Sequence, residues 1–127
     1  MKVALDTNAY SDFMRGVPER VRVVRMVESI HVPLIVLGEL RVGFAAGSRE
    51  EENVETLRRF LASPRVSVLS PNETTTEHYA RIFVQLRKKG TGIPTNDLWI
   101  AALAQQHDLD LCSSDAHFQN IEGLRLC

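Results

Sequence analysis

Residues 96–112 read Asn-Asp-Leu-Trp-Ile-Ala-Ala-Leu-Ala-Gln-Gln-His-Asp-Leu-Asp-Leu-Cys, and they carry the strongest structural signal in the chain. The segment from Asn96 to His107 predicts a helix that is apolar on nearly every side, from Leu98 through Ala104. A helix with that profile is buried on more than one side. A short apolar run from Leu109 to Cys112 follows and predicts a strand. A buried helix that leads into a strand is therefore expected here.

The rest of the chain repeats this alternation of helical patterns and short apolar runs. Helices are expected over residues 20–29, 39–46, 51–61 and 73–89, and strands over residues 3–5, 32–37, 66–69 and 124–126. Pro33 is expected near the beginning of the second strand, where a missing N–H is tolerated. Alternating strands and helices indicate a parallel sheet covered on both faces. We therefore expect one α/β domain over residues 1–127, with four to five parallel strands.

The length of the chain and its cysteines indicate whether disulfides or structural zinc are needed to stabilise the fold. A chain of 127 residues can bury a core without disulfides or metal staples. Its two cysteines, Cys112 and Cys127, have neither a Cys-x-x-Cys spacing nor the neighbouring ligands that zinc requires. Cys112 lies in an apolar run and is interpreted as a small core residue. No disulfide is expected, as in most cytosolic proteins.

Membrane and export signals are not apparent. No stretch approaches the roughly 20 apolar residues that a transmembrane helix needs. The N-terminal segment Met1-Lys2-Val3-Ala4-Leu5 meets Asp6 too early for a signal peptide. It is interpreted as a strand, and a cytoplasmic location is expected.

The net charge of −1 does not by itself indicate a nucleic-acid-binding protein. Basic residues nevertheless gather in two groups: Arg15, Arg20, Arg22 and Arg25, and then Arg87, Lys88 and Lys89. Solvated helix faces are the favoured interpretation of each group taken alone. The alternative is a surface that follows the phosphates of a nucleic acid beside an acidic site.

Four acids fall where a parallel sheet forms its sites, beyond the carboxyl ends of the strands. Asp6 directly follows the first expected strand, Glu39 lies two residues after the second, and Asp115 lies three residues after Cys112. Asp97 begins the helix that leads into the last of these strands. The four side chains are therefore expected to share one rim of the sheet.

Each acid also has a purely structural interpretation. Asp6 could form a turn, Glu39 and Asp97 could favour a helix N-terminus, and Asp115 could cap a helix. Taken together, clustered carboxylates repel one another and raise each other's pKa, which favours a cation between them. Oxygen ligands of this kind suit Mg²⁺ or Mn²⁺, and such ions promote phosphodiester cleavage. The short polar residues Thr7, Asn8 and Ser113 could form turns or orient the ligands.

Four motifs, in this order and spacing, resemble PIN-domain ribonuclease toxins of the VapC type. They are Leu-Asp-Thr-Asn at 5–8, Leu-Gly-Glu-Leu-Arg at 37–41, Pro-Thr-Asn-Asp-Leu-Trp-Ile-Ala-Ala at 94–102, and Ser-Ser-Asp-Ala-His-Phe at 113–118. The resemblance covers essentially the whole chain. It implies a three-layer α/β/α sandwich, RNA cleavage that depends on Mg²⁺ or Mn²⁺, a homodimer, and inhibition by a small VapB-type antitoxin.

The resemblance also implies roles for particular residues. The acids of the metal site correspond to Asp6, Glu39, Asp97 and Asp115. The residues that support the site correspond to Thr7, Asn96 and Ser113. One departure is Asp108, where family members commonly have glycine before a strand, and it concerns the helix C-cap. His117 is close to Asp115 and is interpreted as a surface residue, with contact to a phosphate as the alternative.

Three other functions fit the sequence less well than the nuclease does. A haloacid-type phosphatase needs an Asp two residues after its nucleophile, and that place holds Asn8. A receiver domain needs a phospho-accepting Asp after the third strand, where Ser70-Pro71-Asn72 stands instead. The third alternative is a catalytically inactive PIN fold that only binds RNA or a partner. Intact acids at all four positions argue against that alternative.

Overall fold

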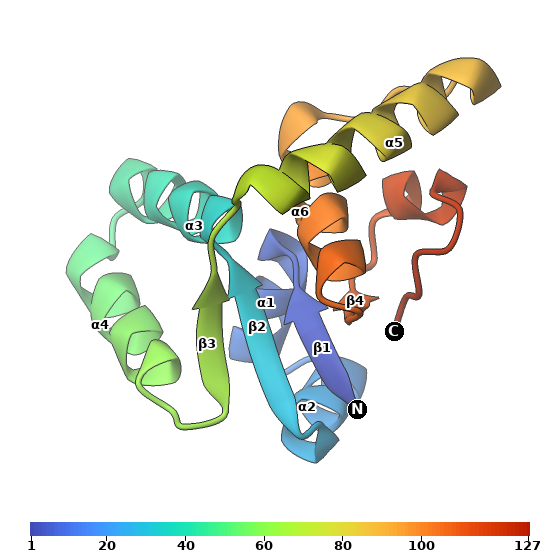
Figure 1. The fold of residues 1–127 in the computed structure, drawn as a ribbon. Helices are drawn as coiled ribbons and strands as arrows, with labels where there is room; N and C mark the ends of the chain where they lie inside the picture. The colour runs from blue at the N-terminus through green and yellow to red at the C-terminus, as the bar shows by residue number, and fades with distance from the viewer.

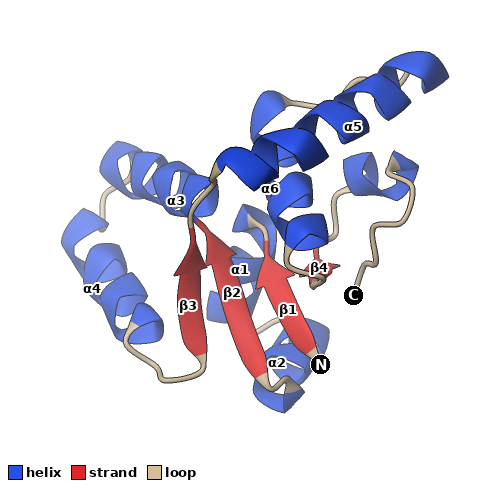
Figure 2. Cartoon of the chain, in the orientation of Figure 1, coloured by secondary structure: helices blue, strands red, loops and turns tan.

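A single parallel sheet organises the molecule. The computed structural model describes residues 1–127. Its strands are β1 (Lys2–Leu5), β2 (Ser29–Pro33), β3 (Val66–Leu69) and β4 (Asp110–Cys112), in the spatial order β3-β2-β1-β4 (Figures 1 and 2). All three strand pairs are parallel, as the sequence predicts. The strand expected at 124–126 does not form, because Leu126 makes only an isolated bridge to Leu111.

Six helices flank the sheet. They are α1 (Thr7–Met14), α2 (Pro18–Met26), α3 (Leu34–Ala46), α4 (Glu50–Leu61), α5 (Glu73–Lys89) and α6 (Thr95–Gln106), and a short 3₁₀ helix η1 (Ala116–Asn120) follows β4. Consecutive helices pack in pairs, α1 with α2, α3 with α4, and α5 with α6. Helices α1 and α2 lie behind the strands in the view of Figure 1. This arrangement confirms the expected α/β/α class. None of the helices combines the length and the apolarity needed to cross a membrane.

Strand β1 and helix α6 form the centre of the core. Val3, Ala4 and Leu5 have no exposed surface, because β1 lies between two strands and beneath helices. Along α6, every residue from Ile100 to Ala104 is buried, which agrees with a helix that is apolar all round. The carboxyl ends of the strands lie toward the beginnings of α3 and α6 in Figure 1. The residues that follow these ends are therefore attached to deeply buried elements of the core.

The boundary between β2 and α3 differs from the expectation. Pro33 ends the strand and does not begin it, and the helix begins at Leu34. The apolar run that follows therefore belongs to a helix, with Val36, Leu37 and Leu40 buried and Leu34 exposed. Because β-branched residues in a buried environment can occupy either element, the run alone could not place this boundary.

Helix α1 was not expected at all. The Asp6-Thr7-Asn8 triplet was interpreted as a turn, yet Asp6 is the N-cap and its side chain accepts a hydrogen bond from the Ala9 N–H. The same short polar residues favour turns and helix N-termini, because both leave backbone N–H groups to be satisfied. Only Ala9 and Tyr10 are buried in this helix, so its apolar pattern is weak.

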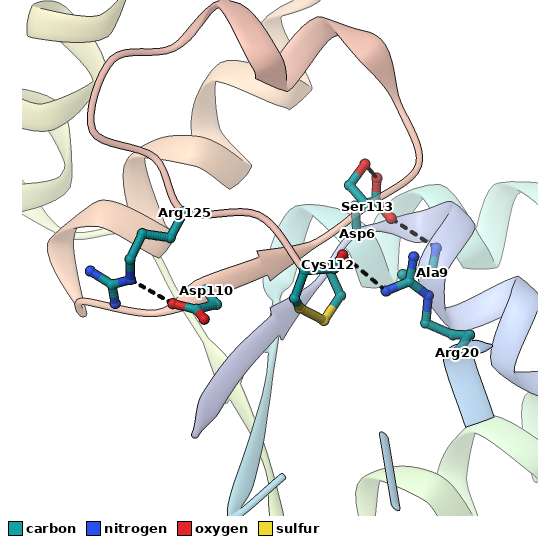
Figure 3. Close-up of a disulfide and its surroundings, with 8 residues drawn as sticks. Asp6, Ala9, Arg20, Asp110, Cys112, Ser113 and Arg125 are labelled. Atoms are coloured by element: carbon teal, nitrogen blue, oxygen red, sulfur yellow. Dashed lines mark hydrogen bonds and ion pairs between the residues drawn. A yellow bond between two sulfur atoms is a disulfide. The ribbon is translucent and has the colours of Figure 1, made fainter. Parts of the chain in front are cut away.

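The expectation of unpaired cysteines was wrong. Cys112 is fully buried, as predicted, but it forms a disulfide with Cys127 (Figure 3). The C-terminal segment runs alongside β4, where Leu111 N–H donates to the Arg125 carbonyl and Cys127 N–H donates to the Leu111 carbonyl. These backbone contacts bring two cysteines that are 15 residues apart into bonding range. The proximity of the two cysteines depends on tertiary structure, and their spacing in the sequence does not predict it.

Asp108, which stands where glycine is common in the resembled family, lies at the end of a helix, as expected. Asp108 follows the C-cap of α6 and has a φ of 54°, the left-handed conformation that glycine adopts most readily. Aspartate tolerates this conformation better than most residues. Its carboxylate also accepts a hydrogen bond from Arg125, at 2.8 Å. The aspartate therefore ties the end of α6 to the C-terminal segment.

Candidate metal-binding site

Backbone elements place the four acids. Asp6 and Asp115 are the N-caps of α1 and η1, and Asp97 lies in the first turn of α6. Glu39 lies in the second turn of α3, one turn later than expected, because that helix begins at Leu34. The capping roles are therefore real for Asp6 and Asp115. They do not exclude a shared site, since each carboxylate oxygen has two lone pairs and can take a further contact beside one hydrogen bond.

A serine connects the two capping acids. Ser113 Oγ donates a hydrogen bond to Asp6 Oδ2 at 2.5 Å, and Ser113 Oγ also accepts a hydrogen bond from the Asp115 N–H at 3.0 Å. Asp6 lies just after β1 and Ser113 just after β4, which are neighbours in the sheet. Figure 3 shows Ser113 directed toward the Asp6 carboxylate. Adjacent parallel strands thus bring together residues that are 107 positions apart.

Asp97 and Asp115 meet at a histidine. The Nδ1 atom of His117 lies 3.2 Å from Asp97 Oδ2 and 3.1 Å from Asp115 Oδ1. The Asp115 carboxylate also accepts the His117 backbone N–H, which fixes the histidine relative to its neighbour. The side chains of the two acids are partly buried, whereas the histidine is 48% exposed. The interpretation of His117 as a mere surface residue was therefore incomplete.

Glu39 is held by two of the expected supporting residues. Thr7 Oγ1 donates to Glu39 Oε1 at 2.6 Å, and Asn96 Nδ2 donates to Oε2 at 3.4 Å. Asn96 directly precedes Asp97 in α6, so its hydrogen bond to Glu39 places Glu39 next to the other acids. The side chain of Asn8 is exposed, and no hydrogen bond joins it to any of the acids. The structure thus links Thr7, Asn96 and Ser113 to the acidic cluster but leaves Asn8 aside.

Two of the acids have perturbed protonation. Burial raises the pKa of Asp6, and hydrogen bonds from Ser113 and Ala9 together with the charge of Arg20 oppose that rise. Burial also raises the pKa of Asp97, where repulsion from Asp115 and Glu39 adds to the effect and His117 opposes it. Both acids therefore carry their negative charge at a cost to folding.

Arg20 is a cation buried behind Asp6. Its side chain projects from α2, only 9% of the residue is exposed, and Nη1 donates to the Cys127 carbonyl at 3.4 Å. Figure 3 shows the Arg20 side chain beside Ala9, in the first turn of α1. The expectation that this basic group forms a solvated face was wrong for Arg20, whereas Arg22 and Arg25 are exposed. The sequence did contain one indication of this burial: Arg20 lies four residues before Val24, on the same face of the helix, and Val24 is buried.

The donor set fits a hard divalent cation. Three of the acids repel one another in pairs, Asp6 with Asp115 and Asp97 with Asp115, and Glu39 repels Asp97 as well. The compensating positive charge is limited to Arg20 beside Asp6 and to His117 when it is protonated. Carboxylate oxygens in excess of basic partners are what Mg²⁺ and Mn²⁺ prefer. The residues present therefore suit such an ion.

Comparison with known proteins places this arrangement in a family. The PIN domain family model matches residues 3–124. Ribonuclease VapC1 of Haemophilus influenzae is 32% identical over 126 residues, covering 95% of this chain and 92% of that protein. Ribonuclease VapC4 of Mycobacterium tuberculosis is 32% identical over 84 residues, which cover 66% of this chain and 65% of that protein.

A solved structure agrees over the full length. The crystal structure of VapBC2 from Rickettsia felis, bound to a DNA fragment from its promoter, contains a chain with a TM-score of 0.89 and 27% sequence identity. The match covers 100% of this chain and 98% of that chain. Fold, motif order and sequence similarity thus lead to one conclusion, that the chain belongs to the PIN-domain family and is similar to its VapC-type ribonucleases.

Proposed function

We propose that the chain is a metal-dependent endoribonuclease, a single PIN domain over residues 1–127, and the toxin of a type II toxin–antitoxin system. The observation that carries the proposal is the convergence of Asp97 and Asp115 on one atom of His117, next to the pair formed by Asp6 and Ser113. The relatives named as ribonucleases support RNA as the substrate. Asp6, Glu39, Asp97 and Asp115 would hold Mg²⁺ or Mn²⁺.

Each residue has a task in this proposal. A bound divalent ion would supply a water of lowered pKa and neutralise charge on the scissile phosphate. Ser113 holds the Asp6 carboxylate through Oδ2, and Thr7 and Asn96 hold both oxygens of Glu39. These contacts orient the carboxylates, and such orientation typically contributes 10–100-fold to metal affinity or activity. Arg20 stabilises the negative charge of Asp6 from behind.

Metal removal tests the catalytic part of the proposal. The purified protein should cleave RNA with Mg²⁺ or Mn²⁺, lose all cleavage in EDTA, and regain it when either ion is returned. Four acids with only Arg20 and His117 as basic neighbours carry an excess of negative charge and would repel an anionic phosphate unless a cation lies between them. Cleavage is followed by resolving the RNA fragments. Full activity in EDTA would contradict the metal mechanism. Metal binding without any cleavage would favour the inactive RNA- or partner-binding module.

The proposed partner is a small antitoxin of the VapB type. The structure from Rickettsia felis is a VapBC2 complex, and other similar chains come from VapBC assemblies. An acidic site attracts a cationic side chain, and an arginine of the antitoxin could contact a carboxylate through two parallel hydrogen bonds. We also propose a homodimer, for which the exposed Phe83 and Val84 of α5 offer apolar surface.

Co-expression tests the partner. Expression of this chain alone should arrest growth, and expression of the small protein encoded beside it should restore growth, because the antitoxin covers the acidic site. The two proteins should also purify together. A variant of the small protein with its arginines changed to alanine serves as the control and should inhibit poorly. Failure of the pair to associate or to restore growth would contradict the toxin–antitoxin assignment.

A further inference from the structure

The position of the His117 ring is set by the fold around it. Its backbone N–H is bound by Asp115 Oδ1, and its ring nitrogen Nδ1 faces a carboxylate oxygen from each of two separate elements, α6 and the start of η1. The His117 side chain is more exposed than those of the two acids, at 48% against 16% for Asp97 and 29% for Asp115. One nitrogen and two carboxylate oxygens therefore form a group of three donor atoms, all within 4.8 Å of one another.

The spacing of these atoms resembles that of ligands on one ion. Adjacent ligands of an octahedral ion at about 2.1 Å lie roughly 3 Å apart. Nδ1 lies 3.2 Å from the Asp97 oxygen and 3.1 Å from the Asp115 oxygen. Small side-chain movements would therefore suffice to bring all three donors onto one ion. The remaining positions would stay available for water and phosphate oxygens.

We propose that His117 is a nitrogen ligand of the metal ion and that it biases the site toward Mn²⁺ over Mg²⁺. The inference rests on the proposed function, because it concerns the same site. An imidazole coordinates a metal ion through an unprotonated ring nitrogen, and Nδ1 is the nitrogen of His117 that faces both carboxylates. Mg²⁺ prefers oxygen ligands and retains its water, whereas first-row transition ions accept imidazole more readily. Loss of the ring should therefore affect the two ions unequally.

Pulsed electron paramagnetic resonance of bound Mn²⁺ tests the proposal without an activity assay. Wild-type protein loaded with Mn²⁺ should show magnetic coupling to a ¹⁴N nucleus, and His117→Gln should bind Mn²⁺ without that coupling. Calorimetric titration should show a roughly ten-fold weaker Mn²⁺ affinity for His117→Gln and less than about a two-fold change for Mg²⁺. His107→Gln is the matched control, since His107 is exposed at the opposite end of α6.

The outcomes separate the two proposals. If the ¹⁴N coupling is absent from wild type, or persists in His117→Gln, then His117 is not a ligand, although the metal site itself stands. Equal losses of Mn²⁺ and Mg²⁺ affinity would overturn the bias toward Mn²⁺. If neither ion binds wild type, the metal-dependent function fails and this inference fails with it. Melting curves of both variants verify that the fold is retained.

Discussion

Asp97→Asn is expected to abolish RNA cleavage and to leave the metal-free protein at least as stable as wild type. Burial and the charges of Asp115 and Glu39 raise the pKa of Asp97, so its ionised form is less favourable in the folded chain than in the unfolded one. Asparagine removes the charge and keeps the shape and the preference for a helix beginning. The loss of a metal-site carboxylate should cost about a hundred-fold or more in activity.

The raised pKa of Asp97 determines how the stability of the metal-free protein changes with pH. As pH rises above 3.8, the ordinary aspartate value, the unfolded chain releases this proton before the folded protein does. The contribution of Asp97 to stability is therefore lost between that pH and its raised folded pKa. Metal-free wild type should lose stability across this window, and Asp97→Asn should lose less. Thermal melting at a series of pH values measures the difference.

Added Mn²⁺ gives the complementary measurement. An ion that binds only the folded state raises the melting temperature by mass action, so wild type should gain stability and Asp97→Asn should gain little. A purely structural aspartate would behave differently. Its neutralisation would cost about 0.3–1 kcal/mol of interaction with the helix dipole and would leave activity largely intact. A destabilised but active variant would therefore show that Asp97 only begins the helix.

Asp6→Ala is expected to abolish cleavage and, unlike Asp97→Asn, to destabilise the fold. Asp6 is only 4% exposed, and its carboxylate accepts hydrogen bonds from the Ala9 N–H and from Ser113 Oγ. Alanine removes the cap of α1, leaves Ser113 Oγ without its acceptor, and removes the negative charge that attracts the buried Arg20. Lost caps and unsatisfied buried groups together cost roughly 2–4 kcal/mol. Relief of the buried charge offsets part of this cost.

Asp6→Asn separates the two effects. Asparagine retains an oxygen for the Ala9 N–H and is a good N-cap, so the free energy of unfolding should stay within about 1 kcal/mol of wild type. Cleavage should still be lost, because a neutral amide is a poor metal ligand. Chemical denaturation measures stability, and the RNA assay measures activity. An active Asp6→Asn variant would mean that Asp6 serves the fold alone.

Much of the fold could be predicted from local patterns. The strand at 66–69 and the helix at 73–89 were placed at their observed ends, because each has its own period and clear end signals. The boundary at Pro33 was placed wrongly, and helix α1 was not predicted. In both, the residues suit two conformations, and packing against the core selects one of them.

The candidate site divides in the same way. The order and spacing of the motifs located Asp6, Glu39, Asp97 and Asp115 without structural information, because strand ends of a parallel sheet meet at one edge. Whether these residues act in catalysis stays a prediction. Asn8 was predicted from its position beside Asp6, but its exposed side chain makes no contact with the acids.

Local sequence therefore determined the ends of elements such as β3 and α5, since backbone preferences act over a few neighbours, but it did not determine the β2–α3 boundary or the presence of α1. Contacts between distant residues were decided only by tertiary structure. These include the Cys112–Cys127 bond, the burial of Arg20 behind Asp6, and the approach of His117 to Asp97. Each depends on how neighbouring strands and helices are aligned in space. That alignment reflects the packing of the whole core, and no short stretch of sequence encodes it.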